Sequence, residues 1–375
     1  MDTTEALLRE LIALPSVNPA FVSAGNPRAG EGVVSEFLAD KAVRAGLDVS
    51  FKKAMPQRPN LLLTLRPRNK ARRRILFAPH FDTVNGTDEQ FVPRKSGGRL
   101  YGRGACDTKG SVAAMASALF ELARRGHRPT ETEIIFVGLV DEEDRQTGSR
   151  ALAASGFKAD LAIVGEPTSL RVVTAHKGSL WLRFETRGKS AHGSRPELGR
   201  NAVHEMSKIV NLLETDYAES LRQRRHPLLG YATVSVGVIA GGTQPNIVPD
   251  QCSILVDRRT LPGETEASVM REIHQLLSRE DLHAFSAHNK LDRCDPLETN
   301  PRLPVVAQLL ESAGQREPAG VHYFSDAAVL AGGGIPSVVF GPGDIAQAHT
   351  ANEWVSLAEL ERARMLLLKF LQSLP

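Results

Sequence analysis

The stretch Ile75-Leu76-Phe77-Ala78-Pro79-His80-Phe81-Asp82 decides the fold that we expect. Its apolar part is too short for a helix, and polar residues follow it at once, which is typical of a buried strand that ends at a site. Further apolar runs at 60–65, 134–140 and 161–164 alternate with helical patterns at 3–13, 31–45 and about 111–125. This alternation predicts an α/β domain with a mixed, mostly parallel sheet that helices cover on both faces.

From about residue 179 the pattern becomes that of a second, smaller domain. Strands are expected at 180–186, 233–239, 252–257 and 282–287, and helices at 201–214 and 266–278. Their order, β-α-β-β-α-β, is that of a complete ferredoxin-like unit. The α/β pattern then resumes with a strand at 337–340 and a helix opened by the capping box Ser356-x-x-Glu359. We therefore expect a catalytic domain of residues 1–178 and 292–375, interrupted by an inserted domain of residues 179–291.

The composition is that of an ordinary globular protein. Of 375 residues, 42% are hydrophobic and 24% are charged, and the net charge of +3 is too small to argue for nucleic-acid binding. Three cysteines in so long a chain cannot form a disulfide framework. The acidic N-terminus is unlike a signal peptide, and no apolar run is long enough to span a bilayer. The sequence thus predicts a cytoplasmic protein with neither nucleic acid nor a membrane as a partner.

Residues of the types that bind metals follow the predicted strands. His80 and Glu166 each follow one, the run Asp141-Glu142-Glu143-Asp144 follows another, and His349 ends the loop after 337–340. Asp107 lies in the glycine-flanked turn 102–110. Ligands gather beyond the carboxyl ends of strands in open α/β sheets, although each residue taken singly could be a surface residue. A pocket with so many carboxylates requires cations, because unpaired buried anions are costly, and two divalent ions meet that need.

Taken together and in order, these motifs resemble the M20 metallopeptidases and deacylases, a family that includes acetylornithine deacetylase and succinyl-diaminopimelate desuccinylase. The motifs of the two outer segments are His80-x-Asp82, Gly102-Arg103-Gly104-x-x-Asp107-x-Lys109-Gly110, Asp141-Glu142-Glu143, Glu166-Pro167 and Ala348-His349-Thr350. Those of the inserted domain are Gly188-Lys189-Ser190-Ala191-His192, Gly241-Gly242-Thr243-Gln244-Pro245-Asn246-x-x-Pro249 and Asp257-Arg258-Arg259. Any one motif is weak, whereas the ordered set, which covers nearly the whole chain, is specific.

The resemblance implies a zinc-peptidase-like catalytic domain with a two-metal centre. Asp107 would bridge the two ions, one of them also held by His80 and Glu166 and the other by Glu143 and His349. These ligand types suit Zn²⁺, with Co²⁺ or Mn²⁺ as replacements. A cis peptide bond directly after the bridging aspartate is implied as well.

The resemblance also implies the catalytic roles. Glu142 would be the general base that takes the proton of a metal-bridging water, which then attacks the amide carbonyl. Asp82 would accept the other ring N–H of His80 and so fix its tautomer. His192 would help to stabilise the oxyanion from the partner subunit, since the inserted domain of this family forms homodimers. The alternative for His192 is a plain surface residue.

The substrate implied is a small N-acyl amino acid or a dipeptide. Lys177, Asn246 and Arg258 would bind it, Arg258 by a bidentate contact with an α-carboxylate. Asn246 could instead cap a turn, and Arg258 could form a structural ion pair. The stretch Ala175-His176-Lys177-Gly178 resembles acetylornithine deacetylases more than desuccinylases. The expected enzyme is therefore an amide hydrolase of the acetylornithine deacetylase type. The open alternatives are an M20 dipeptidase or carboxypeptidase, a succinyl-diaminopimelate desuccinylase, and a non-catalytic binding protein on the same scaffold.

Overall fold

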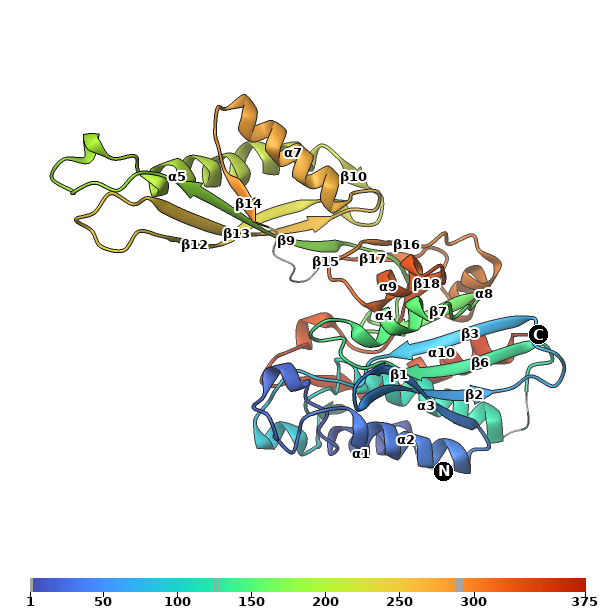
Figure 1. Cartoon of the computed structure of the whole chain (residues 1–375). Coiled ribbons are helices and arrows are strands. Elements are labelled where there is room, and N and C mark those ends of the chain that lie inside the picture. The colour runs from blue at the N-terminus through green and yellow to red at the C-terminus, as the bar shows by residue number, and fades with distance from the viewer. Residues whose placement is uncertain (1–2, 125, 127, 288–292) are drawn as a thin grey trace. The chain divides into compact units, whose positions relative to one another are not determined.

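The computed structural model describes residues 3–124, 126, 128–287 and 293–375. The chain forms two compact units (Figure 1). Unit 1 comprises Met1–Thr174, Thr299–Ala319 and Ser325–Pro375, and unit 2 comprises Ala175–Glu298 and Gly320–Phe324. The expected boundary between residues 291 and 292 lies outside the described residues, and the expected domain limits stay a prediction.

A large mixed sheet organises unit 1. Four strands at its centre run parallel in the order β6 (Thr132–Gly138), β3 (Arg73–Pro79), β7 (Leu161–Gly165) and β18 (Ser337–Val339). Antiparallel strands flank them, β2 (Arg58–Leu65) and then β1 (Asp48–Met55) on one side and β8 (Val173–His176) on the other. β8 continues into unit 2, where it pairs with β16 (Leu297–Glu298); β17 (Ala319–Val321) also pairs with β8. The α/β class and the mixed sheet with a parallel centre are thus confirmed.

Both faces of the central strands are buried, which explains their continuous apolar runs. In β3, Ile75 and Phe77 face the main hydrophobic core, whereas Leu76 and Ala78 are fully buried on the opposite face. Each large apolar side chain buried in this way stabilises the fold by roughly 1.5–3 kcal/mol. The main core is completed by the helices α1 (Thr4–Ile12), α2 (Gly32–Arg44), α3 (Lys109–Arg124), α8 (Pro304–Ser312) and α10 (Leu357–Gln372).

Two helices cover the opposite face of the sheet. They are α4 (Thr147–Ala154) and α9 (Asp326–Gly332), which lie together in Figure 1. A small separate sheet in unit 1 has the order β19 (Trp354–Ser356), β5 (Arg99–Tyr101) and β4 (Arg94–Ser96). The end expected for the third helix, at residue 125, lies outside the described residues.

The last helix begins at the expected place, but its glutamate has a different partner. Ser356 caps α10 by accepting from the backbone N–H of Glu359 at 3.4 Å. In place of the reciprocal bond of a capping box, the Glu359 carboxylate accepts from the backbone N–H of Gly343 at 2.9 Å. The motif therefore fastens the loop that leads to His349 as well as the start of the helix.

Unit 2 has the expected order β-α-β-β-α-β. Its main elements are β9 (Gly178–Arg187), α5 (Ala202–Leu212), β12 (Thr233–Gly241), β13 (Gln251–Thr260), α7 (Glu266–Arg279) and β14 (Phe285–Ala287). The strands form an antiparallel sheet in the order β12-β13-β9-β14, and α5 and α7 cover one face of it (Figure 1). The ferredoxin-like arrangement is thus confirmed, and the last strand begins at Phe285 rather than at the expected Leu282.

Shorter elements complete unit 2. They are α6 (Ala218–Arg222), which continues α5 through a π-helical turn, β10 (Arg225–His226), β11 (Gly230–Tyr231) and β15 (Arg293–Cys294). No described helix in either unit is long and apolar enough to span a membrane.

Candidate metal centre

Asp107 lies between His80 and His349. Its Oδ1 is 3.1 Å from Nε2 of His80, and its Oδ2 is 3.4 Å from Nε2 of His349. His80 follows β3, Asp107 precedes α3 and His349 lies in the loop before β19, so three distant segments meet here. A carboxylate that presents one oxygen to each of two imidazoles has the arrangement expected of a bridging metal ligand.

Two further carboxylates complete the cluster. Glu166, which follows β7, has its Oε1 3.7 Å from Nε2 of His80, and Glu143 has its Oε2 3.1 Å from Nε2 of His349. The potential ligand atoms of His80, Asp107 and Glu166 all lie within 4.8 Å of one another, and so do those of Asp107, Glu143 and His349. The structure therefore brings the five residues predicted as ligands into two groups that share Asp107.

The carboxylates of the cluster are largely buried, whereas the side chain of His349 is 55% exposed. The side chains of Glu142, Glu143 and Glu166 are only 12%, 6% and 6% exposed. Burial raises the pKa of Glu142 and of Glu166 well above the usual range, and neighbouring carboxylates raise it further although His80 opposes them. Oε1 of Glu166 is buried without a hydrogen-bond partner among the described residues. An orphaned carboxylate oxygen among imidazoles and carboxylates fits a divalent cation, which would supply the missing positive charge.

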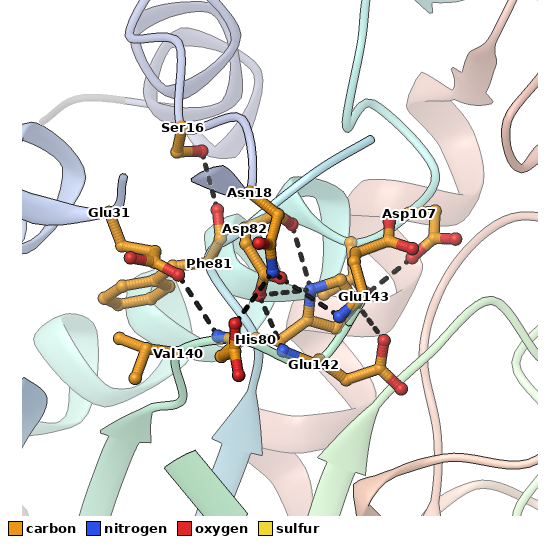
Figure 2. Close-up of polar contacts among 12 residues, drawn as sticks. Ser16, Asn18, Glu31, His80, Phe81, Asp82, Asp107, Val140, Glu142 and Glu143 are labelled. Carbon is orange, nitrogen blue, oxygen red and sulfur yellow. Dashed lines mark hydrogen bonds and ion pairs between the residues drawn. The ribbon is translucent and has the colours of Figure 1, made fainter. Parts of the chain in front are cut away.

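The Asp82 side chain holds the loop that carries Glu142 and Glu143 (Figure 2). Its Oδ1 accepts from the backbone N–H of Glu142 and its Oδ2 from that of Glu143, both at 3.0 Å. Nδ1 of His80 is 3.0 Å from the Asp82 backbone carbonyl oxygen and 3.5 Å from Oδ1. The ring N–H predicted to meet the Asp82 carboxylate thus has the main-chain carbonyl as its closer partner, because the carboxylate is engaged by the loop.

Glu353, which the sequence did not single out, organises the loop of Asp107. Its Oε1 accepts from the backbone N–H groups of Cys106 and Asp107 at 2.9 and 3.0 Å. Its Oε2 accepts from the backbone N–H of Gly104 at 3.0 Å and from Nη1 of Arg103 at 2.7 Å. The available signal was a glutamate four residues after His349. The peptide bond after Asp107 is cis.

Lys109 fastens the other end of the same loop. Its side chain is buried, and Nζ donates to the backbone carbonyls of Leu11 at 2.9 Å and Leu14 at 2.6 Å. Burial lowers the pKa of Lys109 to about 7. The lysine therefore ties the first turn of α3 to the end of α1.

Comparison with known proteins identifies the family of the chain that carries this cluster. A sequence profile of peptidase family M20/M25/M40 matches residues 76–373. The chain belongs to this family. The acetylornithine deacetylase of Myxococcus xanthus is 36% identical over 72% of this chain and 71% of its own length. That of Edwardsiella ictaluri (strain 93-146) is 31% identical over 96% of this chain and 95% of its own.

Solved structures share the fold of this M20 chain. Aminopeptidase PepT from Bacillus cereus ATCC 10987 has a TM-score of 0.80 and 24% identity, with 99% of this chain and 98% of that chain covered. The Bacillus subtilis YXEP protein, a dinuclear metal-binding peptidase of family M20, has a TM-score of 0.71 and 14% identity, with 98% and 96% covered. The M20 resemblance of the motifs is thus confirmed, and the protein is a hydrolase of a metal-dependent family.

Two predicted residues of this M20 protein lie together at the surface of unit 2. His192 and Asn246 are exposed, and the backbone N–H of Gly193 donates to the Asn246 carbonyl at 2.7 Å. His192 forms a β-bridge with Ile247, and its Nδ1 is 2.8 Å from Oγ of Ser194. The structure leaves the ring and the amide accessible, so both residues stay predictions for a site that involves unit 2.

Arg258, predicted to bind substrate, is fully buried in unit 2. Its Nη2 donates to Glu264 at 2.7 Å, its Nε donates to the hydroxyl of Tyr217 at 3.2 Å, and Nη1 donates to the Arg259 carbonyl. These contacts match the alternative of a structural ion pair. The signal was present in the sequence, since Arg258 shares the inward face of β13 with Ile254.

Arg259 points the other way from β13. Its side chain is 31% exposed, and it lines a hollow of about 580 Å³ together with Lys177, Tyr231 and His322, all in unit 2. Nζ of Lys177 donates to the Tyr231 carbonyl at 2.5 Å. Burial lowers the pKa of Lys177, and the charges of Arg258 and Arg259 lower it further. No residue that lines this hollow is acidic, so it offers an anionic group two basic side chains.

Proposed function

We propose that this M20 hydrolase uses two divalent ions to remove the acyl group from a small N-acyl amino acid, in the manner of an acetylornithine deacetylase. The observation that carries the proposal is the position of Asp107 between His80 and His349, with Glu143 and Glu166 completing the two ligand groups. The relatives named acetylornithine deacetylase support this substrate class.

Each ion has a defined set of proposed ligands. His80, Asp107 and Glu166 would hold one, and Asp107, Glu143 and His349 would hold the other. Imidazole with carboxylate suits zinc, and cobalt and manganese accept the same ligand types. When bound, the ions would neutralise the buried carboxylates and lower the pKa of a water molecule in the site.

Glu142 is the proposed general base. Its Oε2 lies 4.0 Å from Nε2 of His80, beside the cluster, and its carboxylate belongs to neither ligand group. The proton that Glu142 takes from water would return to the nitrogen of the leaving amine, so the carboxylate ends as it began. Burial favours the protonated form of the Glu142 carboxyl group and so raises its pKa, which suits a side chain that accepts a proton during the reaction.

For substrate binding we propose Arg259 and Lys177, with Asn246 retained as a candidate. Arg259 is 31% exposed and lines the hollow of unit 2, where its Nε and Nη2 also donate to the Asp257 carboxylate. The guanidinium of Arg258 is instead fully buried against Glu264 and Tyr217. A planar guanidinium can bind a carboxylate through two parallel hydrogen bonds.

The proposed oligomer is a homodimer formed through β12 of unit 2. β12 is the edge strand of its sheet, and its Val238 and Ile239 are 50% and 54% exposed. Unpaired backbone groups beside apolar side chains favour pairing with a second strand, and a two-fold axis would pair β12 with its own copy. In such a dimer, His192 is proposed to stabilise the oxyanion at the partner's metal centre. Cys106 and Cys252 have free, buried thiols, which agrees with the proposed cytoplasmic location.

A peptidase activity is the second candidate, because the fold is shared with an aminopeptidase and a dinuclear peptidase. The purified chain, loaded with zinc, cobalt or manganese, should be assayed with N-acetylornithine, N-succinyl-diaminopimelate, other N-acyl amino acids and a panel of dipeptides. Fastest hydrolysis of an N-acyl amino acid supports a deacylase, and fastest hydrolysis of a dipeptide supports a peptidase.

The mechanism is tested with Glu142→Gln at saturating metal. Loss of a general base is expected to lower kcat by about 10²- to 10⁴-fold. Asp144→Asn, in the same loop but paired with Arg145 at 3.3 Å, is the matched control and should keep the wild-type rate. A Glu142→Gln variant with undiminished kcat would overturn the assignment of the base.

A further inference from the structure

We propose that Glu31 and Arg58 form a buried ion pair that positions the loop Asp141-Glu142-Glu143, and with it the general base. The inference rests on the function proposed above for Glu142. Both residues are positioning residues, since they reach the reaction only through this loop.

The pair has two parallel hydrogen bonds in the interior of unit 1. Nε of Arg58 donates to Oε2 of Glu31 at 2.8 Å, and Nη2 donates to Oε1 at 2.6 Å. The Glu31 side chain is 1% exposed and that of Arg58 is 14% exposed. Burial raises the pKa of Glu31, whereas the contact with Arg58 lowers it. A bidentate pair of this kind fixes direction as well as distance.

The same ion pair also holds Asp141. The backbone N–H of Asp141 donates to Oε1 of Glu31 at 3.1 Å, and Nη1 of Arg58 lies 3.1 Å from Oδ1 of Asp141. Figure 2 shows the Glu31 carboxylate pointing at the backbone where Val140 leads into the loop. Asn18 links Asp141 to Asp82, because its Nδ2 donates to the Asp141 carboxylate at 3.1 Å and to the Asp82 carboxylate at 2.8 Å.

Asp141 needs this support because of its backbone. Its φ of 68° lies in the left-handed region, which residues with a side chain rarely adopt. The turn then closes on itself, since Gln146 donates its backbone N–H to the Asp141 carbonyl at 2.6 Å and Thr147 donates its hydroxyl to Oδ2. Gly148 approaches the strand end so closely that an added Cβ would lie 2.5 Å from the Val140 carbonyl oxygen.

The orientation of Glu142 follows from this arrangement. Asp141 is its immediate neighbour, so a rotation of the Asp141 backbone would swing both Glu142 and Glu143 away from the cluster. Asp82 alone cannot prevent the rotation, because it contacts only the two N–H groups that follow. Misplacement of a reacting group by about 1 Å can cost about 100-fold in rate. The ion pair thus keeps the proposed base Glu142 and the proposed metal ligand Glu143 oriented toward the cluster.

The segment 144–148, which follows the loop, is polar and has a structural role in the same arrangement. Its Gln146, Thr147 and Gly148 close the turn onto Asp141 and Val140. Polarity there is a requirement of the turn, whose buried acceptors need N–H and O–H donors.

The test uses Arg58→Met, Arg58→Lys, Glu31→Gln and the double variant Glu31→Leu/Arg58→Met, all assayed at saturating metal. Replacing both partners of a buried ion pair with apolar residues is often neutral for stability. Asp141 keeps its contacts with Asn18 and Thr147 in this variant, so we expect the double variant to melt closer to the wild-type temperature than Arg58→Met, with kcat about 10- to 100-fold lower and KM within about threefold. Arg58→Lys, which keeps the charge, should recover part of the loss.

Affinity for the second metal ion is a further measurement, and it needs no turnover. Loss of an outer partner of a metal ligand weakens metal binding by about 10- to 100-fold, and Glu143 lies on the positioned loop. We therefore expect calorimetric titration of Arg58→Met with zinc to show one ion bound as in the wild type and one bound more weakly. Unchanged affinity of both ions together with wild-type kcat in the double variant would overturn the proposal.

Arg364→Met is the matched control. Arg364 is 17% exposed and contacts Glu361 and Glu121 on α10 and α3, outside the cluster. It should affect stability and leave kcat and metal affinity unchanged, and an equal loss of kcat there would show a general effect of removing a buried arginine. If the wild-type chain hydrolyses no amide at all, the proposed function fails, whereas the zinc titration still decides whether the ion pair positions Glu143.

Discussion

The carboxylate of Glu353 accepts a hydrogen bond from the backbone N–H of Asp107 at 3.0 Å. Glu353 also accepts hydrogen bonds from three other N–H groups of the segment 103–106, and it lies four residues after His349. One side chain therefore links the loops of two proposed metal ligands. This link is unrelated to the chemistry of the ligands, so it can be tested separately from them.

Glu353→Gln is expected to weaken metal binding. A glutamine amide would turn an NH₂ group toward N–H donors, so at least one of the four hydrogen bonds would be lost. Loss of such an outer contact lowers metal affinity by about 10- to 100-fold. Zinc titration by calorimetry measures the change. Glu361→Gln on α10, a glutamate that is 47% exposed and pairs with Arg364, is the control. Equal zinc affinity in both variants would contradict the role given to Glu353.

Metal removal is expected to destabilise the protein. Burial raises the pKa of Glu142 and Glu166 well above the usual range, so divalent ions would relieve unfavourable crowding of carboxylates. A ligand at 1,000 times its Kd stabilises the folded state by about 4 kcal/mol. Thermal melting should therefore shift upward with added zinc, cobalt or manganese and downward with a chelator. Asp107→Asn should show a much smaller shift in Tm. A wild-type Tm that changes with neither the metal ions nor the chelator would argue against a metal centre.

Substitution of Arg258 is expected to affect stability, whereas substitution of Arg259 is expected to affect substrate binding. Arg258→Met removes one partner of a buried ion pair with Glu264, which costs about 3–5 kcal/mol of stability. Arg259→Met removes a partly exposed guanidinium that pairs with Asp257, and it should raise KM by about 10-fold or more with a smaller change in Tm than Arg258→Met. Steady-state kinetics and thermal melting of the two variants separate these effects. A raised KM in Arg258→Met with normal kinetics in Arg259→Met would instead support Arg258 as the substrate-binding arginine, as the sequence predicted.

The role of His192 across a dimer can be tested by mixing two inactive variants. Glu142→Gln lacks the base and His192→Ala lacks the proposed oxyanion donor. If His192 acts in the partner's site, half of the randomly mixed dimers contain one fully intact site of two, which gives about a quarter of wild-type activity. Activity is measured after unfolding and refolding the mixture. No gain over the separate variants would show that His192 does not act in trans.

His176 is expected to make stability depend on pH. It is fully buried in β8, and burial lowers its pKa to about 4, while its Nδ1 lies 2.9 Å from the Lys177 carbonyl oxygen. The folded pKa lies below the unfolded value of about 6.5, so the contribution is present above pH 6.5 and is lost as the pH falls toward 4. The loss amounts to roughly 3 kcal/mol.

The comparison for His176 uses urea unfolding of the wild type and His176→Asn between pH 7 and 4. The variant should lose less stability over this range than the wild type, because asparagine does not titrate. His283→Asn, at a position whose side chain is 86% exposed, is the control and should follow the wild type. Parallel curves for all three proteins would contradict the prediction.

The residues proposed as metal ligands could be predicted because each is marked by its local surroundings. His80 and Glu166 come directly after apolar runs that became β3 and β7, and Asp107 lies between glycines. Parallel strands bring their carboxyl ends to one edge, so these side chains meet once the strands pair. The alternation and helical periodicity of apolar residues identified the element order of unit 2.

The positioning residues Glu31 and Arg58 could not be recognised from their local sequence. Glu31 lies at the N-cap of α2 and Arg58 lies in β2, so their contacts with Asp141 depend on how these separate segments pack. Arg258 was selected by its motif, although the alternation of Cys252, Ile254 and Val256 already placed it on the buried face of β13.

The sequence by itself thus determined the α/β class, the inserted β-α-β-β-α-β unit and the residue types gathered at the strand ends, because periodicity and residue type are local properties. Only the tertiary structure decided which oxygen of Asp107 faces which histidine, which arginine is buried, and which carboxylates support Glu142. Hydrogen-bond partners and burial depend on segments far apart in the chain, and their positions are set by packing.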